Sequence, residues 1–200
     1  MKILTLDTSY TISGFCVYDT EICKIDYGCF VTKKTENKAL DYYSRMKFQI
    51  KEIIELINQE RPSIIIMEAP SFFSKGNTFL QTVASNLIFQ FFIIKEIEEK
   101  EMTDVEFYTI PPRSLKKMFG SGKLEKKKII EKIKQLGLIN FNSLKSDEID
   151  DVADSIMYLI AFLKSEKKEL TKKSNVILYK KENFGSKDFY KKKFVERIKI

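Results

Sequence analysis

The sequence predicts an α/β protein with a central mixed five-stranded sheet flanked by helices, and two observations support this class. Short apolar segments alternate with longer segments whose apolar residues recur every three or four positions. The first three apolar segments are separated only by turn residues, which is typical of an antiparallel meander, whereas helical segments separate the later ones. A folded core is expected, because 44% of the 200 residues are hydrophobic.

Five apolar segments are expected to form the strands. They are residues 2–6, 14–19, 24–33, 63–68 and 105–110. The fourth segment, SIIIME, is continuously apolar until its last residue, Glu68, which is typical of a strand that is covered on both faces. The first segment ends in the same way, because Asp7 follows KILTL directly.

Five further segments are expected to be helices. They are residues 39–60, 78–100, 113–118, 124–136 and 147–164. The periodicity is clearest in the first, where an apolar stripe comprises Leu40, Tyr43, Met46, Ile50, Ile53, Ile54 and Ile57, and Pro62 ends the helix. We expect one domain over residues 1–164, followed by a basic C-terminal extension, 165–200, that forms an arm or a small added hairpin.

The positive charge is concentrated in two blocks. Residues 164–200 carry 13 Lys and Arg against five Asp and Glu, and residues 113–134 carry nine against two, so the rest of the chain is acidic. Such a distribution indicates binding to a polyanion, with nucleic acid as the first candidate. The alternative is a lysine-rich surface that reflects compositional bias.

The residue types exclude several kinds of site. The absence of histidine excludes Ser-His-Asp triads and histidine ligands, and makes a zinc site improbable. Cys16, Cys23 and Cys29 are expected to be reduced thiols. The longest apolar run, 87–94, is too short to span a bilayer, and the opening residues do not resemble a signal peptide, so we expect a cytoplasmic protein.

Acidic residues gather in the stretch SDEIDDVADS, which opens the last predicted helix. Asp147, Asp150, Asp151 and Asp154 lie opposite its apolar stripe. A solvated acidic helix start would explain Asp147 and Asp150, because the helix dipole favours anions there. It explains Asp151 and Asp154 less well, because they lie beyond the first turn.

Three segments therefore place carboxylates where the predicted sheet ends. A carboxylate at the end of a buried strand is costly unless it is solvated or paired with a cation. Carboxylates without histidine favour a hard cation, Mg²⁺ with Mn²⁺ as a substitute. A pair of such ions is suited to phosphodiester hydrolysis, so the acids and the basic blocks together predict a nuclease.

Four stretches in this order resemble the RuvC-type Holliday junction resolvases of the RNase H-like superfamily, particularly the phage and poxvirus members. They are ILTLDTSYTISGFCVYD, IIIMEAPSFFSKGNTFLQTVASNLI, IPPRSLKKMFGSGKLEKKKII and IDDVADSIMYLIAF, and they span residues 2–163. The resemblance implies an RNase H-like fold and a metal-dependent endonuclease that cuts four-way DNA junctions by paired symmetric nicks.

The resemblance also implies roles for individual residues. The catalytic and metal-binding residues would be Asp7, Glu68, Asp151 and Asp154, with Asp147 or Asp150 as the alternative to Asp151 if the register slips. Lys126 would be catalytic or contact DNA. The expected DNA-binding residues are Phe72, Phe73, Lys75, Arg113, Lys116, Lys117, Lys123 and Lys127. Phe72 or Phe73 would stack on unpaired bases, and core packing is the alternative for both.

A homodimer is expected, because twofold symmetry matches the symmetry of a four-way junction. The candidate interface is the helix 78–100, whose apolar residues are Phe79, Val83, Leu87, Ile88, Phe91 and Ile94; plain core is the alternative. Three other functions stay open. They are a nuclease for other branched DNA or RNA–DNA hybrids, a non-cutting protein of the actin-like ATPase fold, and a catalytically silent junction-binding protein.

Overall fold

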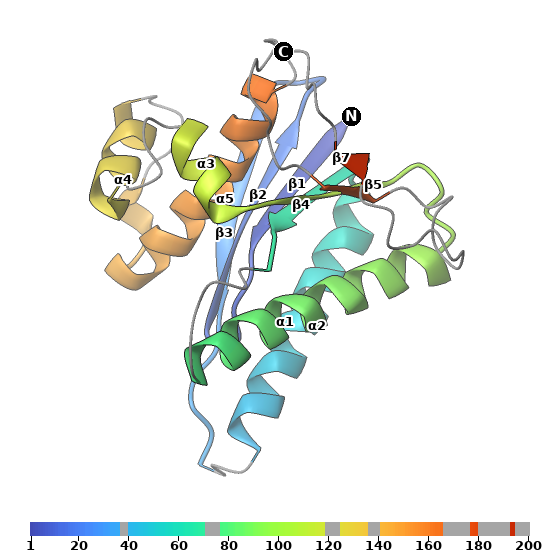
Figure 1. Cartoon of the computed structure of the whole chain (residues 1–200), viewed down its shortest axis with the longest axis vertical. Coiled ribbons are helices and arrows are strands. Elements are labelled where there is room, and N and C mark those ends of the chain that lie inside the picture. The colour runs from blue at the N-terminus through green and yellow to red at the C-terminus, as the bar shows by residue number, and fades with distance from the viewer. Residues whose placement is uncertain are drawn as a thin grey trace.

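In the computed structural model, the protein consists of a central mixed sheet with helices on both faces (Figure 1). The structure describes residues 1–36, 40–70, 77–118, 125–135, 141–165, 177–179 and 193–194. None of the helices in these residues is long and apolar enough to cross a membrane.

The five predicted strands form the sheet, and two short strands extend it. The strands are β1 (Lys2–Asp7), β2 (Ile12–Asp19), β3 (Lys24–Val31), β4 (Ile64–Glu68), β5 (Glu106–Ile110), β6 (Ile177–Tyr179) and β7 (Lys193–Phe194). Their order is β3-β2-β1-β4-β5-β6-β7. Only the β1–β4 and β4–β5 pairs are parallel. The short strands β6 and β7 come from the C-terminal extension and cover the otherwise unpaired edge of β5.

The five predicted helices are also present, each within two residues of its expected bounds. They are α1 (Asp41–Glu60), α2 (Asn77–Glu99), α3 (Pro112–Met118), α4 (Lys126–Gln135) and α5 (Ser146–Ser165), with a one-turn 3₁₀ helix at Phe141–Ser143 before α5. The buried stripe of α1 begins only at Met46, whereas Leu40 and Tyr43 are exposed. The predicted stripe is therefore wrong at Leu40, which precedes α1, and at Tyr43, which lies in the first turn of α1.

Two apolar clusters lie on the two faces of the sheet. One contains residues of α1 and α2, and the other contains residues of α3, α4 and α5. Along β1, Leu4 and Leu6 face the first cluster and Ile3 faces the second. Because strand side chains alternate between faces, Asp7 lies on the α5 side, and the same alternation in β4 places Glu68 there.

Small residues let α5 pack unusually close to the sheet. A Cβ atom on Gly14 of β2 would lie 2.2 Å from the backbone oxygen of Asp151 in α5. The neighbouring strand adds a hydrogen bond, because Thr5 Oγ1 donates to the backbone oxygen of Ser155 at 2.7 Å. In the sheet register Gly14 pairs with Asp7, so this contact brings the backbone of Asp151 beside Asp7.

We expect Gly14→Ala to destabilise the protein by about 1–3 kcal/mol or more, because the new methyl group overlaps helix backbone that cannot rotate away. Gly28→Ala is the matched control in β3. A Cβ there would meet ring atoms of Phe15, the nearest at 2.9 Å, and this ring can shift. Urea denaturation measures both losses, and an equal loss in the two variants would contradict the tight contact between α5 and β2.

Candidate active site

Two acidic residues end neighbouring parallel strands at the same edge of the sheet. Leu6 of β1 pairs with Met67 of β4, and Asp7 and Glu68 are the residues that follow. Both are partly buried. The expectation that the strand ends bring these two acids together is met by the geometry.

Helix α5 adds two more carboxyl groups from a distant part of the chain. Asp151 lies against Gly14 through its backbone, and its side chain is within hydrogen-bonding reach of Asp7. Asp154 is one turn further along and interacts electrostatically with both Asp7 and Glu68. Four acids from β1, β4 and α5 therefore form one cluster, which we call the carboxylate cluster: Asp7, Glu68, Asp151 and Asp154.

The carboxylate cluster holds its protons more tightly than ordinary carboxyl groups do. Loss of hydration, followed by the charges of Asp154, Glu68 and Asp151, raises the pKa of Asp7 well above its usual range. Burial and then the charge of Asp154 raise the pKa of Glu68 to about 7. Burial raises the pKa of Asp151 to about 6 and also raises that of Asp154. The pKa values are raised because the four carboxyl groups are partly removed from water and their negative charges repel one another.

Lys126, the first residue of α4, supplies a positive charge to the cluster. Its Nζ lies 3.4 Å from Asp154 Oδ2 and 3.7 Å from Asp150 Oδ2. Burial disfavours the charged lysine, but the carboxylates of Asp154 and Asp150 outweigh burial and raise the pKa of Lys126. One ammonium group does not neutralise four carboxylates.

The other two aspartates of α5 occupy different places. Asp150 lies on the side that faces Lys126, and Asp147 is exposed at the start of the helix. The charges that raise the pKa of Asp7 are those of Asp154, Glu68 and Asp151, whereas the charge of Asp150 raises the pKa values of Asp151 and Asp154. The close approach of α5 to β2 is what brings Asp151 to Asp7.

The donor chemistry of the carboxylate cluster fits a hard divalent cation. All four groups present oxygen, and their mutual repulsion would be relieved by positive charge. In the part of the chain that the structure describes, no three acidic or thiol groups are arranged tightly enough to hold one ion. The four acids are therefore close enough to interact but do not converge on one point, and Lys126 forms an ion pair with Asp154.

Helices α3 and α4, which carry many of the basic residues, lie on the same side of the sheet as α5, and both contact it (Figure 1). Arg113, Lys117 and Lys127 are exposed, and the charge of Lys116 lowers the pKa values of Glu68 and Asp154. The remaining residues expected to bind DNA lie outside the described residues: Phe72, Phe73, Lys75 and Lys123.

The candidate interface on α2 divides between core and surface. Val83 is buried, and Ile88 and Ile94 pack against the core, whereas Leu87 and Phe91 are 46% and 62% exposed. Nothing is described of the side chain of Phe79. Core packing therefore applies to Val83, Ile88 and Ile94, whereas Leu87 and Phe91 are not explained by the core.

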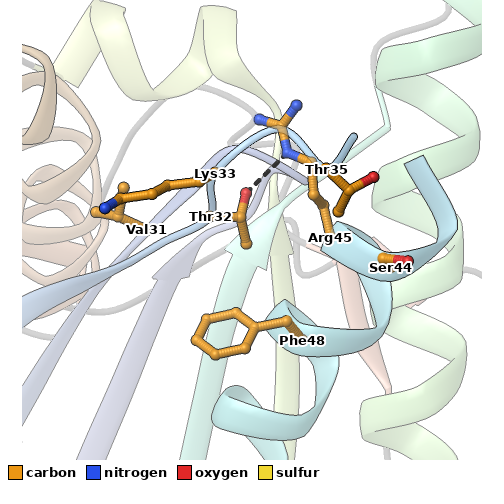
Figure 2. Close-up of a pocket in the computed structure, with 7 residues that line it drawn as sticks. All are labelled: Val31, Thr32, Lys33, Thr35, Ser44, Arg45 and Phe48. Carbon is orange, nitrogen blue, oxygen red and sulfur yellow. Dashed lines mark hydrogen bonds between the residues drawn. The ribbon is translucent and has the colours of Figure 1, made fainter. Parts of the chain in front are cut away.

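A hollow of about 240 Å³ lies between the end of β3 and the start of α1 (Figure 2). Arg45 in its wall donates from Nε to Thr32 Oγ1 at 2.9 Å, pairs with Asp41 at 3.3 Å, and lies over the ring of Tyr10. These contacts tie α1 to the turn that follows Asp7. The role of Arg45 is therefore structural.

Two residues beside the cluster were missed by sequence reasoning. Tyr158 is buried, within hydrogen-bonding reach of Glu68, and its pKa is raised well above its usual range, first by burial and then by the charge of Glu68. Gln90 of α2 donates from Nε2 to the backbone oxygen of Glu68 at 3.1 Å. The spacing of Tyr158 could have identified it from the sequence. It lies seven residues after Asp151 and four after Asp154, which places all three on one side of the helix.

We expect the stability of the metal-free protein to fall as the pH rises from about 4 to about 7. Raised carboxyl pKa values mean that the folded state binds more protons than the unfolded chain in this window, so deprotonation costs stability. Asp7→Asn removes one repelling charge, so in EDTA at about pH 8 it should unfold about 2–4 °C or more above the wild type, equivalent to about 1 kcal/mol or more.

Thermal denaturation of wild type, Asp7→Asn and Asp147→Asn checks this expectation. Asp147→Asn removes the same charge from an exposed position at the start of α5, where the helix dipole favours an anion, so its melting temperature should be equal to or slightly below that of the wild type. Mg²⁺ should stabilise the wild type more at pH 8 than at about pH 5, because the ligands must lose protons. A less stable Asp7→Asn protein in EDTA would refute mutual repulsion within the cluster.

No family model and no curated protein matches the sequence. Among solved structures, RuvC of Thermus thermophilus superposes with a TM-score of 0.55 at 17% identity, over 82% of this chain and 96% of that one. T. thermophilus RuvC in complex with a Holliday junction substrate matches with a TM-score of 0.53 at 18% identity, over 79% and 90%. The yeast mitochondrial Holliday junction resolvase matches with 0.51 at 18% identity, over 78% and 75%. The chain therefore has the RuvC-type, RNase H-like fold that its sequence motifs imply.

Proposed function

We propose that the protein is a metal-dependent, structure-specific DNA endonuclease that resolves four-way junctions by paired symmetric nicks. The observation that carries the proposal is the carboxylate cluster, built on a RuvC-type fold and bordered by basic helices. Structures with the same fold include one in complex with a Holliday junction, which supports this choice of substrate.

Asp7, Glu68, Asp151 and Asp154 would hold the metal, because their oxygens suit a hard cation and their repulsion favours one. When bound, a pair of Mg²⁺ ions, or Mn²⁺ in their place, would activate a water molecule and stabilise the leaving 3′ oxygen. Asp150 lies to one side with Lys126, and Asp147 at the exposed helix start, so Asp151 is the better candidate ligand.

The chain's own cations would position the scissile phosphate. Lys126 lies 3.4 Å from Asp154, so its ammonium group would be close enough to the cluster to contact a phosphate oxygen of the bound DNA. In this reaction the water would lose a proton as its oxygen bonds to phosphorus, the bond from phosphorus to the 3′ oxygen would break, and the 3′ oxygen would take up a proton and leave as a hydroxyl group. No covalent bond to the protein is needed.

The basic helices would bind the phosphate backbone beside the cut. Arg113, Lys117 and Lys127 are exposed on α3 and α4, and Lys116 adds charge close to Glu68. Contacts to phosphate fix the position and orientation of DNA without reading its sequence. Recognition would therefore depend on the shape of the junction.

A homodimer would place two such sites on one junction. The outer side of α2 exposes Leu87, Phe91 and Phe92, and an apolar groove of about 420 Å³ lies between α2 and α1. Large exposed apolar patches often mark interfaces. A contact through this side of α2 would leave the carboxylate cluster, on the opposite face of the sheet, open to DNA.

A cleavage assay tests the function. We expect the wild type with Mg²⁺ to cut a labelled four-way junction at paired symmetric positions, and to leave a linear duplex and an RNA–DNA hybrid intact. Asp151→Asn should bind the junction but cut it about 100-fold more slowly or worse, which is a loss of about 3 kcal/mol of transition-state stabilisation. Asp147→Asn is the matched control on the same helix and should cut normally.

Three outcomes would contradict the proposal in different ways. Absence of cutting on every substrate would reject the enzyme. Faster cutting of the hybrid than of the junction would favour the broader nuclease. Normal cutting by Asp151→Asn together with loss in Asp147→Asn would mean that the metal site lies at the start of α5.

We expect Phe91→Glu to convert a dimer into a monomer, because it places a charge in the centre of the apolar side of α2. Phe48→Glu on α1 is the control, since Phe48 is also exposed, at 43%, but lies beside the hollow at the end of β3. Size-exclusion chromatography with light scattering measures both. A dimeric Phe91→Glu protein would place the interface elsewhere.

A further inference from the structure

Glu68 is held from both faces of the sheet. On the α2 side, Gln90 is 8% exposed and donates from Nε2 to the backbone oxygen of Glu68. The same Nε2 also lies 2.5 Å from Asn86 Oδ1, one turn earlier in α2, which orients the amide. On the α5 side, the hydroxyl of Tyr158 reaches the Glu68 carboxylate.

The hydroxyl of Tyr158 is not explained by packing. Tyr158 is 2% exposed and belongs to the apolar cluster under α5, where a phenylalanine would fill the same space. A buried hydroxyl costs free energy unless it is hydrogen-bonded, and the Glu68 carboxylate is the acceptor within its reach. A phenol that donates to a carboxylate makes a strong, charge-assisted hydrogen bond.

Tyr158 also lies where it can link the two halves of the carboxylate cluster. Asp151, Asp154 and Tyr158 follow one another at helical spacing along one side of α5. The helix that supplies two of the acids thus also supplies the donor for a third acid, which ends a different strand. A shift of α5 would move all three groups together.

We propose that Tyr158 is a positioning residue that holds the Glu68 carboxylate in the orientation needed for metal binding. The inference rests on the nuclease function proposed above. The hydroxyl donates to the Glu68 carboxylate and so limits the directions in which this group can point. Groups that orient a metal ligand in this way typically contribute about 10–100-fold to metal affinity or activity.

A matched pair of tyrosine variants tests the proposal. Tyr158→Phe removes the hydroxyl at the cluster. Tyr108→Phe removes a hydroxyl that donates to Glu106 at 2.5 Å, and Tyr108 packs against the same apolar cluster. Both changes are equal in chemistry and similar in surroundings, but only the first affects a proposed metal ligand.

We expect Tyr158→Phe to bind Mn²⁺ about 10-fold or more weakly in calorimetry without DNA, while Tyr108→Phe binds like the wild type. Junction cleavage by Tyr158→Phe should recover as the Mg²⁺ concentration is raised, and its affinity for the junction in EDTA should be unchanged. In a Glu68→Gln background, removing the Tyr158 hydroxyl should cause no further loss of Mn²⁺ affinity, because the ligand it orients is already gone.

The outcomes separate this inference from the function on which it rests. If the wild type binds Mn²⁺ and cuts junctions, and Tyr158→Phe has the same Mn²⁺ affinity, the positioning role is rejected and the nuclease stands. A drop in melting temperature with unchanged Mn²⁺ affinity would likewise reduce Tyr158 to a core residue. If the wild type neither binds Mn²⁺ nor cuts, the proposed function fails, and the role of Tyr158 fails with it.

Discussion

The mutual repulsion of four partly buried carboxyl groups is the constraint on which the rest of this structure depends. Burial, followed by the charges of neighbouring cluster members, raises the pKa values of Asp7, Glu68 and Asp151, and Lys126 and Lys116 offset only part of this charge. A protein that needed only stability would not gather such groups. Their retention is understandable if a cation completes the site, because the same repulsion that weakens the metal-free fold then favours metal binding.

The surrounding fold is arranged so that this costly cluster can form. Strand alternation places Asp7 and Glu68 on the α5 face, whereas alternate residues of the same strands, such as Leu6 and Met67, pack with α1 and α2 in the first apolar cluster. Gly14 and the bond from Thr5 to Ser155 hold α5 close to β1 and β2. The apolar packing of α5 against β1, β2, β3 and β4 supplies the stabilisation that the cluster itself lacks.

Much of this arrangement could be predicted, because strand and helix periodicities are local signals. The acids at the ends of β1 and β4 could be placed together once both strands were assigned to one parallel pair. The family resemblance favoured Asp151 over Asp150, but residue spacing alone left both open, because the position of Asp151 beside Asp7 depends on how closely α5 approaches Gly14. From the sequence alone, Tyr158 is one more apolar residue of a helix and is expected to lie in the core. The exposure of Leu40 and Tyr43 could not be predicted either, because it depends on where α1 leaves the sheet. The two short strands beyond β5 carry no periodicity long enough to detect.

The central claim is that the carboxylate cluster is a divalent-cation site. A crystal structure of the protein grown with Mn²⁺ and measured at an X-ray energy where manganese scatters anomalously tests it most directly. The account predicts anomalous density at the carboxyl ends of β1 and β4, within about 2–2.3 Å of oxygens of Asp7 and of at least one other cluster member. Density beside Asp147 and Asp150 alone, or an ordered cluster without any anomalous peak at saturating Mn²⁺, would contradict it.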